Sequence, residues 1–148
     1  MIGKNLVALG LAEAPVRTLL FLNVSMDPAL RILTVDDERS ITESMRFIFG
    51  GARFQVTAAE TGAEALGKID ADPDGYDVII IDQKMPRLTG IELVHEIRQR
   101  PYSGKIMILS AHLSADVRSA YEELDVDVMI DKPFDIKELR VLLDQLAV

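Results

Sequence analysis

The side chains best suited to chemistry stand at the ends of short apolar runs. Asp36 and Asp37 come directly after one run and Asp82 after another, while Ser110 and Lys132 lie at the ends of two more. Carboxylates that meet in one place repel one another, so such a group either has a raised pKa or holds a cation. Oxygen ligands with room for water suit Mg²⁺, and Mn²⁺ accepts the same ligands. These residues predict a cation site, provided that the fold brings them together.

The same set of side chains suits phosphoryl transfer. A metal ion, an ammonium group and a hydroxyl can each contact one phosphoryl oxygen, and the reaction needs little beyond such positioning and charge neutralisation. An aspartate can act as the nucleophile and form an acyl phosphate. Asp82 is the best candidate because it ends the most apolar run, residues 77–81. The first loop has no glycine-rich phosphate cradle, so this site would bind an anion only through its cation.

The apolar runs predict the strands that position these residues, at 31–35, 54–57, 77–81, 105–109 and 126–130. Helical spacing or a capping pattern follows each run, beginning near Ile41, Thr61, Thr89, Val117 and Asp135. This alternation predicts an α/β fold, a doubly wound five-stranded parallel sheet with helices on both faces. Sites in such folds lie outside the carboxyl ends of the strands, so the candidate residues should meet at one edge.

Motifs follow the predicted strands in a fixed order: Asp36-Asp37 after the first strand, Asp82 followed by Met85-Pro86 and Thr89-Gly90, Ser110 after the fourth strand, and Lys132-Pro133 after the fifth. Taken together and in this order, these motifs resemble the response-regulator receiver domain. The resemblance runs from about residue 30 to the C-terminus. It implies a (βα)5 flavodoxin-like receiver domain at residues 29–148, preceded by an N-terminal extension of unknown role at residues 1–28.

The resemblance also implies roles for the acidic residues. Asp82 would accept a phosphoryl group from a histidine kinase or a phosphotransfer protein. Asp37, Asp82 and the backbone carbonyl of Lys84 would bind Mg²⁺ directly, and Asp36 would assist, often through water. Taken alone, Asp37 could instead cap the first helix, as Asp often does after a strand.

Lys132 and Ser110 would act on the phosphoryl group itself. The resemblance implies that Lys132 contacts this group, next to a cis peptide bond to Pro133. Ser110 would move toward a phosphoryl oxygen and report its presence. A downstream protein target would read the face made by the fourth helix, the fifth strand and the fifth helix.

Three positions depart from the family pattern. Met129 stands at the switch position, three residues before the lysine, where the family usually has Tyr or Phe. Methionine is flexible and could still respond to Ser110, although no ring is available to change its exposure. The positions that tune phosphoryl lifetime, two residues after Asp82 and two after Ser110, hold Lys84 and His112.

Composition narrows the function classes. The net charge of −8 disfavours a nucleic-acid surface, because phosphate backbones are bound by basic patches. The sequence has no cysteine, which excludes disulfides and thiolate metal sites. The apolar stretches at 6–11 and 19–24 are too short to span a bilayer. We expect no membrane contact and a cytoplasmic location, where kinases and ATP are found; Met26 is an alternative natural start.

Three functions remain open from the sequence. The first is a phosphorylation-controlled binding module, with no enzymatic activity beyond its own phosphorylation and dephosphorylation. The second is an aspartyl-phosphate phosphatase, which usually needs a second Asp at the position held by Lys84. The third is a degenerate scaffold, which Met129 favours and the intact acidic site disfavours. The last predicted helix ends the chain, so we expect output through protein contacts. The chain could be a stand-alone regulator or a fragment of a larger one. It could also form a homodimer.

Overall fold

The computed structural model describes residues 28–146, so the predicted extension falls outside the described residues except for its last position. The ten elements are β1 (Leu30–Val35), α3 (Arg39–Ile48), β2 (Phe54–Ala59), α4 (Gly62–Ala71), β3 (Val78–Asp82), α5 (Gly90–Arg98), β4 (Lys105–Ser110), α6 (Ala115–Glu123), β5 (Val128–Asp131) and α7 (Ile136–Leu146). No helix among these residues is long and apolar enough to cross a membrane.

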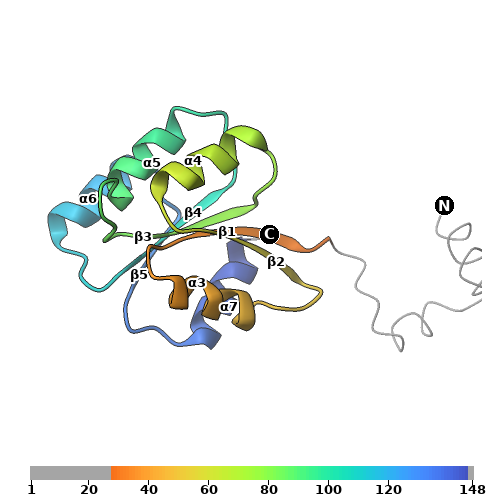
Figure 1. The fold of residues 1–148 in the computed structure, drawn as a ribbon. Coiled ribbons are helices and arrows are strands. Elements are labelled where there is room, and N and C mark those ends of the chain that lie inside the picture. The colour runs from red at the N-terminus through yellow and green to blue at the C-terminus, as the bar shows by residue number, and fades with distance from the viewer. Residues whose placement is uncertain (1–27, 147–148) are drawn as a thin grey trace, which may run out of the picture.

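The strands form one parallel sheet with helices on both faces. The strand order is β2-β1-β3-β4-β5, and every neighbouring pair is parallel. In Figure 1, α4, α5 and α6 cover one face of the sheet, and α3 and α7 cover the other. The predicted doubly wound, five-stranded α/β fold is confirmed.

Strand β3 is buried along its whole length because it lies in the middle of this sheet. Ile79 and Ile81 pack into the core on the α4, α5 and α6 side, whereas Val78 and Ile80 pack into the core under α3 and α7. Successive side chains of a strand point to opposite faces, so a strand covered on both faces needs apolar residues at every position. This explains why residues 78–81 form an unbroken apolar run that ends at Asp82.

Truncating the centre of this strand should destabilise the protein strongly. Ile79 is fully buried, so Ile79→Ala removes packing that the surroundings cannot replace, and we expect a loss of about 2–5 kcal/mol in the free energy of unfolding. Chemical denaturation measures this change. Val141→Ala in α7 is the control, because its side chain is 54% exposed and should cost much less. Equal losses in the two variants would contradict this description of the core.

The predicted helix starts at Thr61 and Thr89 are confirmed. The Thr61 hydroxyl accepts a hydrogen bond from the Glu64 backbone N–H at 3.0 Å, and Thr89 does the same for Glu92 at 3.3 Å. These bonds satisfy N–H groups that the first helical turn leaves unpaired. The Glu64 carboxylate completes the first cap by accepting from the backbone N–H of Glu60.

The fifth strand begins two residues later than predicted. The Val126 N–H donates to the Tyr121 carbonyl, so it still belongs to the turn that ends α6. Asp127 ties this segment to β4, because its N–H donates to the Ile106 carbonyl and its carboxylate accepts from the Ile106 N–H. Regular pairing with β4 therefore starts only at Val128.

The two ends of the described region meet at the amino edge of the sheet. Leu30, at the start of β1, and Leu146, at the end of α7, line one pocket there. Each helix runs back across the sheet after its strand, so a chain that begins with a strand and ends with a helix returns to the edge where it started.

Candidate functional site

The carboxyl ends of β1, β3 and β4 bring the candidate residues to one edge. Val35 pairs with Ile81 across β1 and β3, so Asp36 and Asp82 follow neighbouring positions of the sheet. On the other side of β3, Asp82 pairs with Leu109, one residue before Ser110. The edge predicted for the site is therefore the edge at which these side chains gather.

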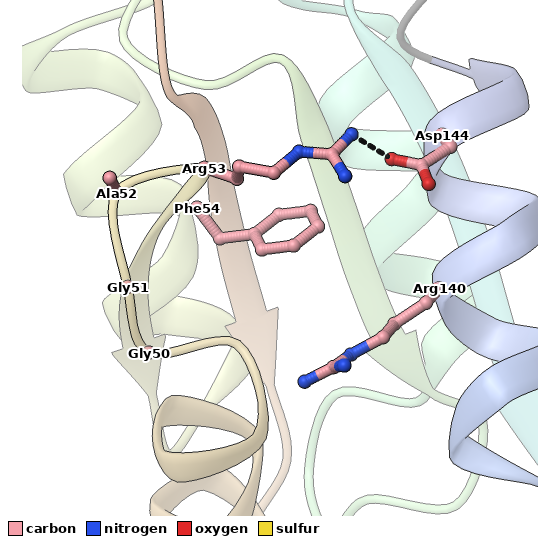
Figure 2. Close-up of a pocket in the computed structure, with 7 residues that line it drawn as sticks. All are labelled: Gly50, Gly51, Ala52, Arg53, Phe54, Arg140 and Asp144. Atoms are coloured by element: carbon pink, nitrogen blue, oxygen red, sulfur yellow. Dashed lines mark hydrogen bonds and ion pairs between the residues drawn. The ribbon is translucent and has the colours of Figure 1, made fainter. Parts of the chain in front are cut away.

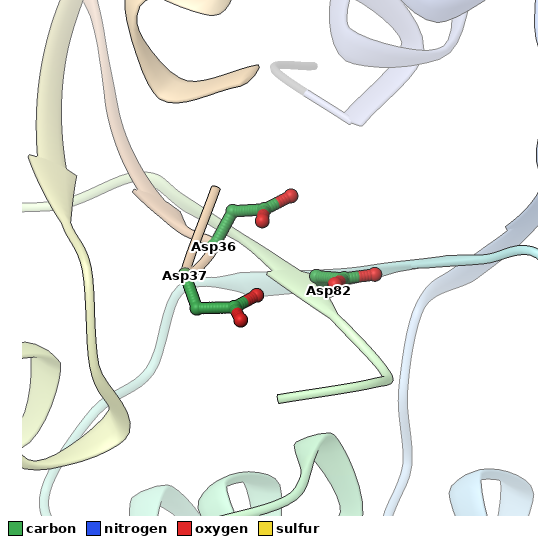
Figure 3. A group of neighbouring side chains, drawn as sticks. All are labelled: Asp36, Asp37 and Asp82. Carbon is green, nitrogen blue, oxygen red and sulfur yellow. The ribbon is translucent and has the colours of Figure 1, made fainter. Parts of the chain in front are cut away.

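Three carboxylates meet there, as Figure 3 shows. Asp36, Asp37 and Asp82 each offer an oxygen atom, and these atoms lie within 4.8 Å of one another. Asp36 and Asp82 are buried, at 5% and 9% exposed, whereas Asp37 is exposed. Oxygen ligands from two buried residues and one exposed residue form a group into which a hard divalent cation fits, with one side left open to water.

Lys132 is the counter-ion of this group. Its Nζ lies 3.1 Å from Asp82 Oδ1 and 3.9 Å from Asp36 Oδ2. The Lys132 backbone N–H donates to the Ser110 carbonyl at 2.7 Å, which fixes the loop after β5 against the end of β4. The predicted cis peptide bond between Lys132 and Pro133 is confirmed. One ammonium group thus faces two of the three carboxylates.

The electrostatics of Asp36 show that this compensation is incomplete. Burial raises the pKa of the Asp36 carboxyl to about 6, and the charges of Asp82 and Asp37 raise it further, against the opposing effects of the Glu38 N–H and Lys132. The Glu38 backbone N–H donates to Asp36 Oδ1 at 2.9 Å. Because the ionised Asp36 carboxylate is disfavoured in these surroundings, a cation bound beside it would stabilise it. The raised pKa therefore supports a cation site.

Mg²⁺ binding should weaken as the pH falls through about 6, because the proton on Asp36 competes with the cation. Without metal, Asp36 binds its proton more tightly in the folded than in the unfolded chain. Its contribution to stability is therefore greatest below its ordinary pKa of 3.8 and is lost as the pH rises through about 6. Calorimetric titration with Mg²⁺ should show up to about tenfold weaker binding per pH unit below this point.

Asp36→Asn is the matched control for this titration, since the amide has a similar shape and does not titrate between pH 5 and 8. The remaining pH dependence of Mg²⁺ affinity should be much flatter in this variant. The same affinity at about pH 5 and about pH 7.5 in the wild type would contradict the role assigned to the Asp36 proton.

Ser110 is buried and engaged with the loop that follows it. Its hydroxyl donates to the His112 carbonyl at 2.9 Å and accepts from the His112 N–H at 3.1 Å. The His112 side chain is exposed and lies before α6, as expected for a solvated residue near a helix start. Met129 packs, partly buried, against the core beneath α4, α5 and α6. Lys84 lies in the loop after β3 with its side chain exposed, and the role of its carbonyl stays a prediction.

The alternative of Asp37 as a helix cap is wrong. The residue at the N-cap of α3 is Glu38, and no side chain accepts a capping bond there. It is the Asp36 carboxylate that accepts from the Glu38 N–H. The Asp37 side chain does not cap α3, and its carboxylate lies close to those of Asp36 and Asp82.

Sequence reasoning missed two polar residues near this edge. Gln83, directly after Asp82, and Tyr121, in α6, each bury an oxygen atom that has no hydrogen-bond partner. Gln83 could have been noticed from its position next to the nucleophile candidate. Tyr121 gave no signal, because an aromatic residue on the apolar side of a helix is the pattern of an ordinary core residue.

A second pocket, of about 230 Å³, lies at the opposite edge of the sheet (Figure 2). Its two arginines are already engaged. Arg53 forms an ion pair with Asp144 at 2.9 Å, and Arg140 donates to the Ile48 carbonyl at 2.6 Å. This pocket therefore offers less unpaired charge than the acidic edge, which remains the candidate site.

Comparison with known proteins shows what this chain is similar to. The family model described as "Response regulator receiver domain" matches residues 32–144. "Response regulator MprA" from Mycobacterium avium is 36% identical over 110 residues, which are 74% of this chain and 47% of that protein. The chain thus spans about half the length of the curated relatives it matches.

Solved structures agree with the sequence matches. Chemotaxis protein CheY4 of Vibrio cholerae has a TM-score of 0.73 and 28% identity, covering 80% of this chain and 98% of that one. The non-phosphorylated HemR receiver domain from Leptospira biflexa has a TM-score of 0.72 and 26% identity, covering 79% of this chain and 93% of that one. In both cases the shared part is nearly the whole of the solved chain.

Proposed function

We propose, from the fact that this chain belongs to the response regulator receiver family, that it accepts a phosphoryl group on Asp82 and signals through protein contacts. One observation carries the proposal. Asp82 is held at the end of the central strand, with two further carboxylates on one side and Lys132 Nζ at 3.1 Å. This is an anionic nucleophile whose charge can be balanced while an anionic group approaches.

The reaction would proceed with these residues in distinct roles. A carboxylate oxygen of Asp82 attacks the phosphorus of a phosphohistidine on a histidine kinase or phosphotransfer protein. The new O–P bond forms as the N–P bond breaks, and the histidine leaves. Lys132 contacts the transferred group and offsets its charge. Asp82 itself keeps no proton through this step, since it must react as the anion.

Asp36, Asp37 and Asp82 would hold Mg²⁺, with the backbone carbonyl of Lys84 as a further ligand. When bound, this ion lowers the repulsion between the carboxylates and the incoming phosphoryl oxygens. Asp37 is the exposed member of the group, so it is the one best placed to exchange water for metal. Mn²⁺ would take the same oxygen ligands.

The output would run through Ser110 to α6, β5 and α7. Ser110 stands at the end of β4 between the acidic edge and α6, and its hydroxyl would exchange its bond with the His112 carbonyl for one with a phosphoryl oxygen. A protein target, or a second copy of the chain, would then read the altered face. The proposed phosphohistidine donor makes the cytoplasm the expected compartment, and no turnover of other substrates is expected.

Incubation with acetyl phosphate and Mg²⁺, followed by intact-mass spectrometry, tests the proposal. The wild type should gain the mass of one phosphoryl group, and chelation of Mg²⁺ should prevent the gain. The absence of any gain would instead support a scaffold that does not depend on phosphorylation. Sustained phosphate release from unrelated phosphomonoesters would support a phosphatase.

A further inference from the structure

Two buried oxygen atoms without hydrogen-bond partners lie close to the phosphoacceptor loop. Tyr121 is fully buried, and its hydroxyl has no partner. The side-chain oxygen of Gln83 is also buried and unpaired. An unsatisfied buried polar atom costs free energy, so each one needs an explanation such as a bound water or a second conformation.

The two oxygens face the same point, at the start of α5. A β-carbon added to Gly90 would lie 2.4 Å from the Tyr121 hydroxyl oxygen and 2.9 Å from Gln83 Oε1. Only glycine leaves room for both groups here. A hydroxyl donor and an amide acceptor are therefore neighbours inside the protein, yet they are not joined by a hydrogen bond.

Gln83 connects this pair directly to Asp82. It is the next residue in the chain, its N–H donates to the Leu109 carbonyl, and its carbonyl accepts from the Gly90 N–H. The Gln83 backbone is thus tied to β4 and α5, which holds its side chain directly beside Asp82. Burial raises the pKa of the Tyr121 hydroxyl, and the charge of Asp82 raises it further.

Tyr121 connects the same pair to the face proposed for output. It lies in α6, and its carbonyl accepts from the Leu124 and Val126 N–H groups in the turn that leads to β5. Its ring is part of the core beneath α4, α5 and α6. A change in the position of the Tyr121 hydroxyl would therefore affect both α6 and the turn that leads to β5.

We propose that Tyr121 is a positioning residue that couples the state of Asp82 to α6, by donating a hydrogen bond to Gln83 Oε1 when Asp82 is phosphorylated. This deepens the proposed function and rests on it for the event that is sensed. In this structure the two oxygens are unpaired. A phosphoryl group adds charge and volume at Asp82, and the neighbouring Gln83 side chain then turns so that the pair can close. A buried water that bridges the pair in both states is the competing explanation.

Amide hydrogen exchange of residues 115–126, before and after loading with acetyl phosphate and Mg²⁺, distinguishes these explanations. A bond formed only in the loaded state should slow exchange in this segment about fivefold in the wild type. Tyr121→Phe and Gln83→Met each delete one partner while keeping a similar volume, so each should lose the slowing. The double variant should lose no more than either single variant, because both delete the same bond.

Tyr102→Phe is the matched control. Tyr102 is also a buried tyrosine of the same core, but its hydroxyl donates to the Lys105 carbonyl at the far edge of the sheet. This variant should keep the wild-type slowing. Slowing that persists in Tyr121→Phe, or losses that add in the double variant, would overturn the coupling and favour the static water.

Intact mass measured in parallel separates this inference from the proposed function. If the wild type gains no phosphoryl group, the proposed function fails, and exchange is compared between the unmodified protein and Asp82→Asn. A difference in residues 115–126 that disappears in the Tyr121→Phe background would still support sensing of the Asp82 charge through Tyr121. No difference there would overturn it.

Discussion

Asp82→Asn should gain no phosphoryl mass from acetyl phosphate under conditions in which the wild type gains one group. The amide has nearly the same shape as the carboxylate but lacks the anionic oxygen that attacks phosphorus. The loss should be complete within detection, since the other two carboxylates of the group lie in the loop after β1 and not at the end of the central strand β3. Intact-mass spectrometry after equal incubation times measures the result.

Asp131→Asn is the matched control for this experiment. Asp131 ends β5 at the same edge of the sheet, but its side chain is 65% exposed and its ionic contact is with Arg118. This variant should gain phosphoryl mass like the wild type. A phosphoryl group on the Asp82→Asn protein would instead identify a different acceptor, with Asp36 and Asp37 as the first residues to map by peptide mass analysis.

Lys132→Met should slow phosphoryl uptake about 100-fold, the usual effect of removing one group that stabilises transferred charge. The methionine keeps much of the side-chain volume but removes the ammonium group that lies 3.1 Å from Asp82. The rate of mass gain at saturating acetyl phosphate and Mg²⁺ measures this effect. Loss of Lys132 should also raise the pKa of Asp36 above about 6, because Lys132 holds it down in the wild type.

Lys105→Met controls for the loss of one positive charge. Lys105 begins β4 at the opposite edge of the sheet, where its Nζ lies 3.7 Å from Asp127. Its removal should leave the rate of phosphoryl uptake unchanged within about twofold, because salt screens the interaction between charges at opposite edges of the sheet. Equal slowing in both lysine variants would show that net charge, and not contact with Asp82, controls the reaction.

The fold was predictable because its central strands, β3 and β4 above all, are buried on both faces. Such strands are unbroken apolar runs, as in residues 78–81, and their ends are marked by the first polar residue. Because Asp36 and Asp82 are the first polar residues after two such runs, it was also predictable that they lie at the same edge of the sheet. The start of β5 was not predictable, since the bond between Val126 and the Tyr121 carbonyl depends on how α6 ends.

The finer properties of the site depend on packing, which no local pattern encodes. Asp36 and Asp37 are adjacent and chemically identical, yet one is buried with a raised pKa and the other is exposed. Similarly, the approach of Tyr121 to Gln83 joins residues that are distant in sequence and depends on the missing side chain of Gly90. Only the packed helices show which of these groups touch.

The pocket shared by Leu30 and Leu146 has a consequence for architecture. Both ends of the described region leave from the side of the sheet that faces away from Asp82. Any tethered neighbour, whether the first 27 residues or a fused module like those implied by the length of the relatives, would be attached at the back of the molecule. An attachment on that side would leave the acidic edge at Asp82 open to the phosphodonor proposed above.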